Sequence, residues 1–80
     1  MERKFKFMDV VKWATPMNEA ERKDVMVVED TDDMDTLQVR HLDDQGNSTK
    51  GHAKENELRI VGKASPYEPI QDIVKRYISK

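Results

Sequence analysis

The sequence predicts a single, mostly β domain that ends in one amphipathic α-helix. Short runs of β-branched residues at 25–28 and 58–61 are typical of strands and are bounded by polar turns. Near the C-terminus the apolar residues instead recur at spacings of three and four, the period of a helix with one buried face. The chain has 80 residues, which suffices for one small core.

The first predicted strand covers residues 5–14. Phe5, Phe7, Val11 and Trp13 occupy odd positions, with lysines at positions 6 and 12 between them, which is the alternation of a half-buried strand. Residues 8–10 interrupt this rhythm, so we place a turn or a bulge there. The polar segment 15–24 is expected to be a loop because Pro16 disfavours helix at Thr15. Within that loop, residues 19–23 are able to form one helical turn without an apolar face.

Residues 25–28 predict a buried strand closed by an acidic turn at 29–35. A third strand is expected at 36–42, with Leu37 and Val39 on one face. The turn residues of 43–51, including Gly46 and Asn47, predict a hairpin tip before a weak strand at 49–54. A further dense apolar strand is expected at 58–61, ending at Gly62.

The clearest predicted helix follows Pro69, a residue that suits a first helical turn. One apolar stripe is formed by Ile70, Ile73, Val74, Tyr77 and Ile78. Acidic residues near the start of this segment and basic residues near its end match the helix dipole.

The order of these elements resembles that of SH3-like small barrels. The resemblance is carried by FKFMDVVKWATP, VMVVED, LQVRHLD and KENELRIVG, where KENEL takes the place of the single helical turn before the last strand. It implies a five-stranded barrel over residues 1–63, with residues 64–80 adding the helix to the same domain. The Trp-x-x-Pro and Glu-Leu-x-x-Val patterns are also similar to those of a group of short, uncharacterised bacterial proteins. The Ala-Leu-Tyr-Asp-Tyr stretch of proline-rich-peptide binders and the glycine-centred basic strand of RNA-binding members are absent, so neither activity is carried over.

The sequence contains no recognised motif for catalysis or for metal binding. There is no cysteine, and His41 and His52 have no recognised metal-ligand spacing. The acidic segment that begins at Asp30 lacks the glycine and glutamate of a calcium loop. We therefore predict no catalytic residue, no metal, no cofactor and no small-molecule substrate, and hence no enzyme.

Hydropathy and cysteine content predict the cellular compartment, and the charge pattern bears on possible partners. No apolar run resembles a signal peptide or a membrane span, and the lack of cysteine fits a reducing compartment, so a cytoplasmic protein without a membrane partner is expected. The formal net charge is -2, but acidic residues dominate 29–44 and basic residues outnumber acidic ones in 45–80.

The preferred function is a non-catalytic module for protein interaction or assembly, with a protein partner or a second copy. Its predicted contact residues are Trp13, Ile70, Ile73, Val74, Tyr77 and Ile78. Two alternatives stay open: Trp13 is either an exposed anchor or part of the core, and the helix stripe packs either on its own domain or on another chain.

The alternative function is weak nucleic-acid binding. The residues predicted for it are Lys4, Lys6, Lys12, Arg59 and Lys63, arranged around Trp13. The acidic turns of the chain would repel phosphate groups, which makes nucleic acid the less favoured partner.

Overall fold

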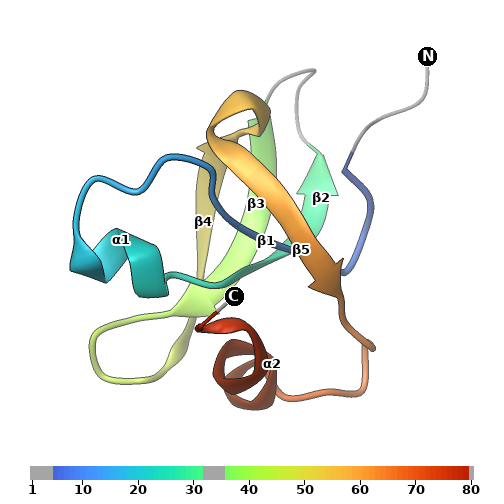
Figure 1. Cartoon of the computed structure of the whole chain (residues 1–80). Helices are drawn as coiled ribbons and strands as arrows, with labels where there is room; N and C mark the ends of the chain where they lie inside the picture. The colour runs from blue at the N-terminus through green and yellow to red at the C-terminus, as the bar shows by residue number, and fades with distance from the viewer. Residues whose placement is uncertain (1–4, 32–35, 80) are drawn as a thin grey trace.

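One antiparallel sheet of five strands forms the centre of the molecule (Figure 1). The computed structural model describes residues 5–31 and 36–79. The strands are β1 (Asp9–Trp13), β2 (Met26–Thr31), β3 (Thr36–Leu42), β4 (Ser48–Lys54) and β5 (Leu58–Lys63). They lie in the order β4-β3-β2-β1-β5, so β4 and β5 are the two edges and the sheet is not closed. The predicted mostly β class with a C-terminal helix is confirmed.

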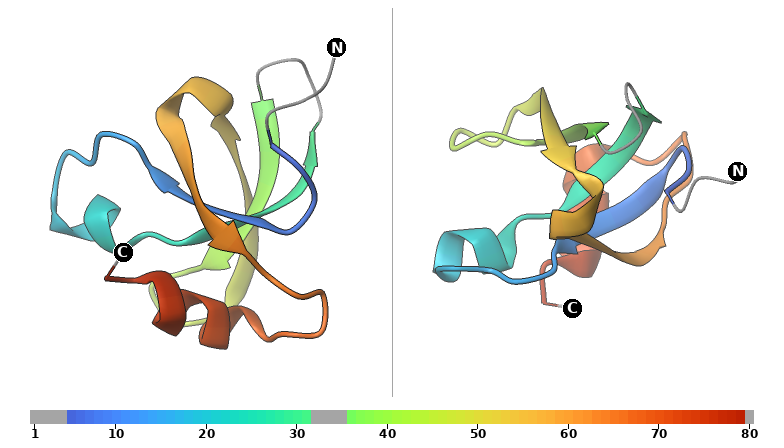
Figure 2. Two further views of the ribbon diagram at one scale, coloured as in Figure 1. Left: turned by 45° about the vertical axis from the view of Figure 1, so that its right-hand side comes forward. Right: turned by 90° about the horizontal axis from the view of Figure 1, so that it is seen from above.

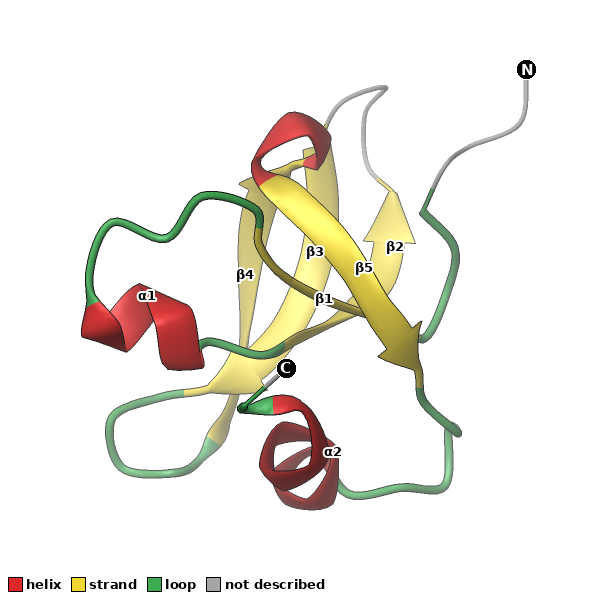
Figure 3. Cartoon of the chain, in the orientation of Figure 1, coloured by secondary structure: helices red, strands yellow, loops and turns green. Residues whose placement is uncertain are grey.

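In the part of the chain that the structure describes, the helical segments lie around the sheet (Figure 3). They are α1 (Glu19–Lys23), the single 3₁₀ turn η1 (Glu55–Glu57) and α2 (Ile70–Tyr77). The α1 turn forms because the Oδ1 atom of Asn18 accepts a hydrogen bond of 2.8 Å from the backbone N–H of Glu21. Helix α2 and the η1 turn were expected at these places, whereas residues 19–23 were expected in a loop, with one helical turn as an option. No helix in the described ranges is long and apolar enough to cross a membrane.

The first strand is shorter than predicted. A turn closes when the backbone N–H of Asp9 donates to the carbonyl of Lys6 at 3.1 Å, and Met8 takes a positive φ of 72°. This turn lies where the alternation was interrupted, and the β1–β5 register also shifts between Val10 and Val11. The turn changes the direction of the chain between Phe5 and β1, so the two phenylalanines do not share a face. Phe5 is buried, whereas Phe7 is 60% exposed.

The second strand starts one residue later than predicted and runs three residues further. It extends to Thr31, so the first part of the predicted acidic turn is strand. The rest of that turn, residues 32–35, lies outside the described residues.

The two faces of the sheet carry separate apolar cores. Neighbouring residues on a strand point to opposite faces, so Val11 and Val28 lie in the first core while Val10 and Val27 lie in the second. The second core is completed by Ile70 and Ile73 of α2. Residues 25–28 are therefore buried on both faces, which explains why that run is apolar without alternation.

Helix α2 packs on its own sheet, below β5 in Figure 1 and beneath the strands when the molecule is seen from above in Figure 2. Gly62 on β5 allows this close approach. A Cβ atom at position 62 would lie only 2.5 Å from two ring carbons, Cε1 and Cζ, of Tyr77. Of the two alternatives left open for the stripe, the structure shows packing on its own domain.

Candidate functional site

Trp13 is held at the end of β1 with its ring half-buried. One side of the ring packs against the first core. The indole Nε1–H donates a hydrogen bond of 2.9 Å to Oδ2 of Asp24. These contacts fix the orientation of the indole, so Trp13 is both part of the core rim and a surface residue.

An open hollow lies beside Trp13, with a volume of about 360 Å³. We call it the Trp13 hollow; it is lined by Trp13, Ala14, Thr15, Met17, Glu21, Asn56 and Glu57. The loop after β1 forms one side and η1 forms the other. The side chain of Met17 is 81% exposed in this wall.

The loop side of the Trp13 hollow is held in shape by Glu21. Its Oε1 atom accepts a hydrogen bond of 2.8 Å from the backbone N–H of Met17. Together with Asn18, which caps α1 from the same loop, this contact fixes the path of the chain before α1. Glu21 and Glu57 place carboxylates on both sides of the hollow, which makes it negatively charged.

A smaller hollow of about 90 Å³ lies on the other side of the indole, and both histidines line it. The Nδ1 atom of His41 lies 3.1 Å from the carbonyl oxygen of Leu42. Within the described ranges, no three histidine, aspartate or glutamate side chains are grouped so that they could hold a metal ion.

The structure does not bring Trp13 together with the helix stripe. Trp13 packs on the first core, whereas α2 packs on the second, so they lie on opposite faces of the sheet. Ile70 and Ile73 are buried, and Val74 and Tyr77 are partly buried against the same core. Only Ile78, which is 39% exposed, presents substantial apolar surface.

The nucleic-acid alternative needs an exposed amine at Lys12, but this side chain is buried. It is 4% exposed, and its Nζ atom donates hydrogen bonds to the carbonyl oxygens of Tyr77 at 3.2 Å and Ile78 at 3.0 Å. Burial and, to a smaller extent, the charge of Arg59 lower the pKa of Lys12. The amine therefore supports the C-terminal end of α2.

The other cations predicted for nucleic acid have different environments where the structure describes them. Lys63 makes an ion pair of 3.6 Å with Asp9. Arg59 is exposed and lies opposite Lys12 across the β1–β5 pair. Lys6 is exposed before β1, and Lys4 lies outside the described residues.

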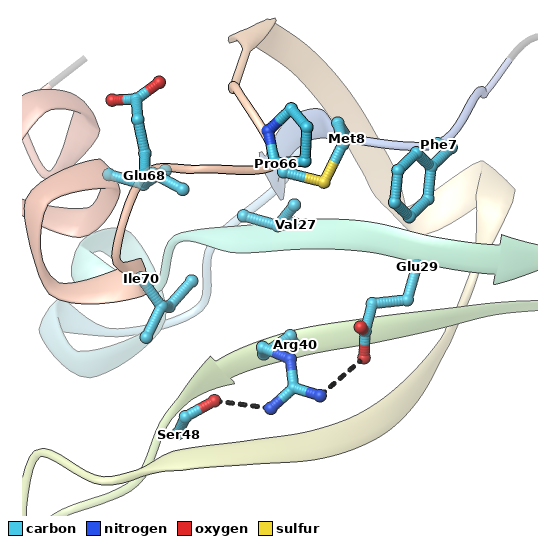
Figure 4. A pocket seen from close by; sticks show the side chains of 10 residues that line it. Phe7, Met8, Val27, Glu29, Arg40, Ser48, Pro66, Glu68 and Ile70 are labelled. Carbon is cyan, nitrogen blue, oxygen red and sulfur yellow. Dashed lines mark hydrogen bonds and ion pairs between the residues drawn. The ribbon is translucent and has the colours of Figure 1, made fainter.

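A second concave surface lies on the face of the sheet that α2 covers, and its volume is about 350 Å³ (Figure 4). We call it the Phe7–Pro66 groove. Figure 4 shows two rows of side chains with Val27 between them: Phe7, Met8 and Pro66 on one side, and Ile70, Arg40 and Glu29 on the other. Arg40 is held by an ion pair of 3.2 Å with Glu29 and by a hydrogen bond of 2.7 Å to the hydroxyl of Ser48.

Glu68 holds in place the side of the groove that carries Pro66. Its carboxylate accepts a hydrogen bond of 2.9 Å from the backbone N–H of Ser65 and forms an ion pair with Arg76. Both contacts lower the pKa of Glu68, that of Ser65 most. They tie the loop that carries Pro66 to the last turn of α2.

Sequence reasoning did not identify the Phe7–Pro66 groove. Its lining comes from five separate segments of the chain, at residues 7–8, 27–29, 40, 48 and 66–73. In addition, Phe7 was expected on the same face as Phe5. The only local signal was the interrupted alternation near Met8, which indicates a turn without showing what it exposes. A comparison of the chain with protein-family models, curated proteins and solved structures finds no match.

Proposed function

We propose that the protein is a non-catalytic interaction module that binds a segment of another protein in the Trp13 hollow. The observation that carries this proposal is the pairing of a fixed, half-buried indole with a methionine that is 81% exposed. Tryptophan side chains held in this way supply much of the binding energy at protein interfaces. Methionine adds an adaptable apolar surface.

The charges of the hollow indicate the kind of segment that fits. Glu21 and Glu57 stand on its two sides. A partner segment with one apolar side chain and an adjacent lysine or arginine would fill the space and match these carboxylates. An acidic segment would meet like charges.

The architecture that we propose is of the SH3-like kind. It is supported by the antiparallel order β4-β3-β2-β1-β5, by the long loop after β1 and by the 3₁₀ turn directly before β5. In this arrangement the loop and the 3₁₀ turn are neighbours, as they are on the two sides of the Trp13 hollow.

Of the six residues predicted to contact a partner, Trp13 now supports the proposal best. Ile70 and Ile73 are buried by their own sheet, so they would reach a second copy only if α2 left that sheet. The nucleic-acid alternative has less support, because the amine of Lys12 points to α2 on the face opposite Trp13.

The test is selection from a random peptide library, followed by affinity measurements with two variants. Met17→Lys puts a positive charge on an exposed wall of the hollow, where it would repel the basic residue of the partner, whereas Tyr67→Lys changes a residue that is 94% exposed and outside the lining. We expect the selected peptides to carry an apolar residue next to a basic one, to lose about tenfold or more in affinity for Met17→Lys and to keep it for Tyr67→Lys. A library that yields no binder, or binders insensitive to Met17→Lys, contradicts the proposal.

A further inference from the structure

We propose that the Phe7–Pro66 groove and the adjoining face of β3 and β4 form a second docking surface, which takes an acidic protein segment with one large apolar anchor residue. This surface shares no residue with the Trp13 hollow. It therefore stands or falls independently of the first site.

The strand register places a series of cations beside the groove. Directly paired residues of antiparallel strands have their side chains on the same face. Val27, on the groove floor, pairs with Arg40, and Arg40 pairs with Lys50. Lys54 follows on the same face, four positions further along β4. We call Arg40, Lys50 and Lys54 the basic strip.

The charges of the basic strip are only partly balanced. Arg40 is paired with Glu29. Lys50 and Lys54 are exposed, and neither makes an ion pair with a carboxylate of residues 5–31 or 36–79. An acidic segment lying along β4 would supply these missing partners and would be guided to the strip by its field.

The groove explains why the segment needs an apolar anchor. Phe7 is 60% exposed at the mouth, and Met8, Val27 and Ile70 provide apolar walls and floor. Pockets that enclose small molecules have volumes of roughly 300–1,000 Å³ and surround most of the ligand. A groove of about 350 Å³ that is open at Phe7 suits one side chain of a longer chain better than a whole small molecule.

The surroundings of the strip favour a short protein segment over a nucleic acid. At the hairpin end, Asp43 and Asp44 are exposed, and at the other end Lys54 is followed directly by Glu55. Along β4 the strip runs from Lys50 to Lys54, a length of about 14 Å. A nucleic acid carries phosphates beyond this length in both directions, where it would meet carboxylates.

The experiment uses the full chain and a fluorescein-labelled peptide of sequence Glu-Asp-Glu-Leu-Asp-Glu, with binding measured by fluorescence anisotropy. Three further probes are a peptide with lysine at every acidic position, a peptide with serine in place of leucine, and a single-stranded oligothymidylate. Amide NMR spectra of the isotope-labelled protein show where the peptide binds. They also show that each variant keeps the fold.

The variants are Lys50→Glu on the strip, Phe7→Ser at the groove mouth and Lys23→Glu on α1 as the matched charge control. We expect the acidic leucine peptide to shift amide signals of β3, β4 and the turn at Met8. Its affinity should fall about tenfold or more for Lys50→Glu and clearly for Phe7→Ser, and stay within about twofold for Lys23→Glu.

Four results would overturn this proposal. They are no binding of the acidic leucine peptide at millimolar concentration, equal binding of the lysine or the serine peptide, tighter binding of oligothymidylate, and amide shifts confined to the Trp13 hollow. The last result would assign the peptide to the first site and leave the second without a ligand.

Discussion

The Nζ atom of Lys12 lies 3.2 Å from the carbonyl oxygen of Tyr77, to which it donates a hydrogen bond. The two residues are 65 positions apart, so this contact joins the first strand to the last helix. A second bond to Ile78 satisfies another carbonyl at the end of α2, where helical carbonyls have no partner within the helix. The fold therefore uses a buried lysine as a cap between its two ends.

Replacing Lys12 by methionine should destabilise the protein. The substitution keeps an apolar stem of similar length and leaves the two carbonyls without their donor. We expect the free energy of unfolding to fall by about 1–3 kcal/mol in urea denaturation at pH 7. Lys75→Met, on the exposed side of the same helix, should change it by less than about 0.5 kcal/mol. Equal effects of both substitutions would mean that the cap has no energetic role.

The contribution of Lys12 should depend on pH in the alkaline range. Burial lowers its pKa in the folded protein below the ordinary value of 10.5. Between the lowered pKa and 10.5 the unfolded chain binds a proton that the folded protein does not, so the free energy of unfolding due to this group rises with pH. Below the lowered pKa both states bind the proton and the contribution is constant.

This pH effect is measured as a difference between two proteins, so that effects of pH on the rest of the protein cancel. Urea denaturation of the natural sequence and of Lys12→Met at several values from pH 7 to pH 10.5 gives that difference. We expect it to rise in favour of the natural sequence toward pH 10.5. A difference that falls over this range would show that the pKa of Lys12 is raised in the folded state.

Gly62→Ala should destabilise the protein through Tyr77. The added methyl group would overlap the tyrosine ring, which must then move away from β5. Overpacking of this kind costs about 1–3 kcal/mol, measured by urea denaturation. In a background with Tyr77→Leu, the ring is gone and Gly62→Ala should cost much less. If the losses in the free energy of unfolding caused by Gly62→Ala and Tyr77→Leu simply add, the tyrosine ring does not pack on Gly62.

A pair of substitutions in α2 tests whether the helix belongs to the core of its own chain. Ile73→Ala removes a buried side chain and should cost about 2–5 kcal/mol, whereas Ile78→Ala removes a partly exposed one and should cost less than about 1 kcal/mol. Both effects should be independent of protein concentration. A cost for Ile73→Ala that changes with concentration would place the stripe in an interface between copies.

Much of the fold follows from local patterns in the sequence. The alternation of Leu37 and Val39 with polar neighbours defined β3, the spacing of Ile70 and Ile73 defined α2, and the polar residues around Gly46 defined the hairpin. Each of these signals lies within one element. They determine which residues form strands and helices, and the structure confirms them.

The surfaces depend on contacts between distant segments, and they could not be predicted in the same way. The alternation that predicted a strand at residue 12 says nothing of the carbonyls of α2, which bury its amine. Met8 has a positive φ, a conformation that glycine or asparagine usually takes. Because methionine is not a typical turn residue, the sequence gave no sign of this turn. Phe7 was therefore predicted on the wrong face of the sheet. Trp13 was recognised because a single tryptophan beside a loop is conspicuous without any knowledge of the fold.

The most direct test of the central claim is an amide NMR titration of the full chain with a peptide that the library selection returns. We predict the largest shifts at Trp13, its indole N–H, Met17 and residues 55–57. We also predict that Met17→Lys lowers the affinity read from these shifts by about tenfold or more and leaves the spectrum of the free protein unchanged outside the hollow. Shifts that cluster on α2 or are spread over the lysines, with no change at the indole, would contradict binding in the Trp13 hollow.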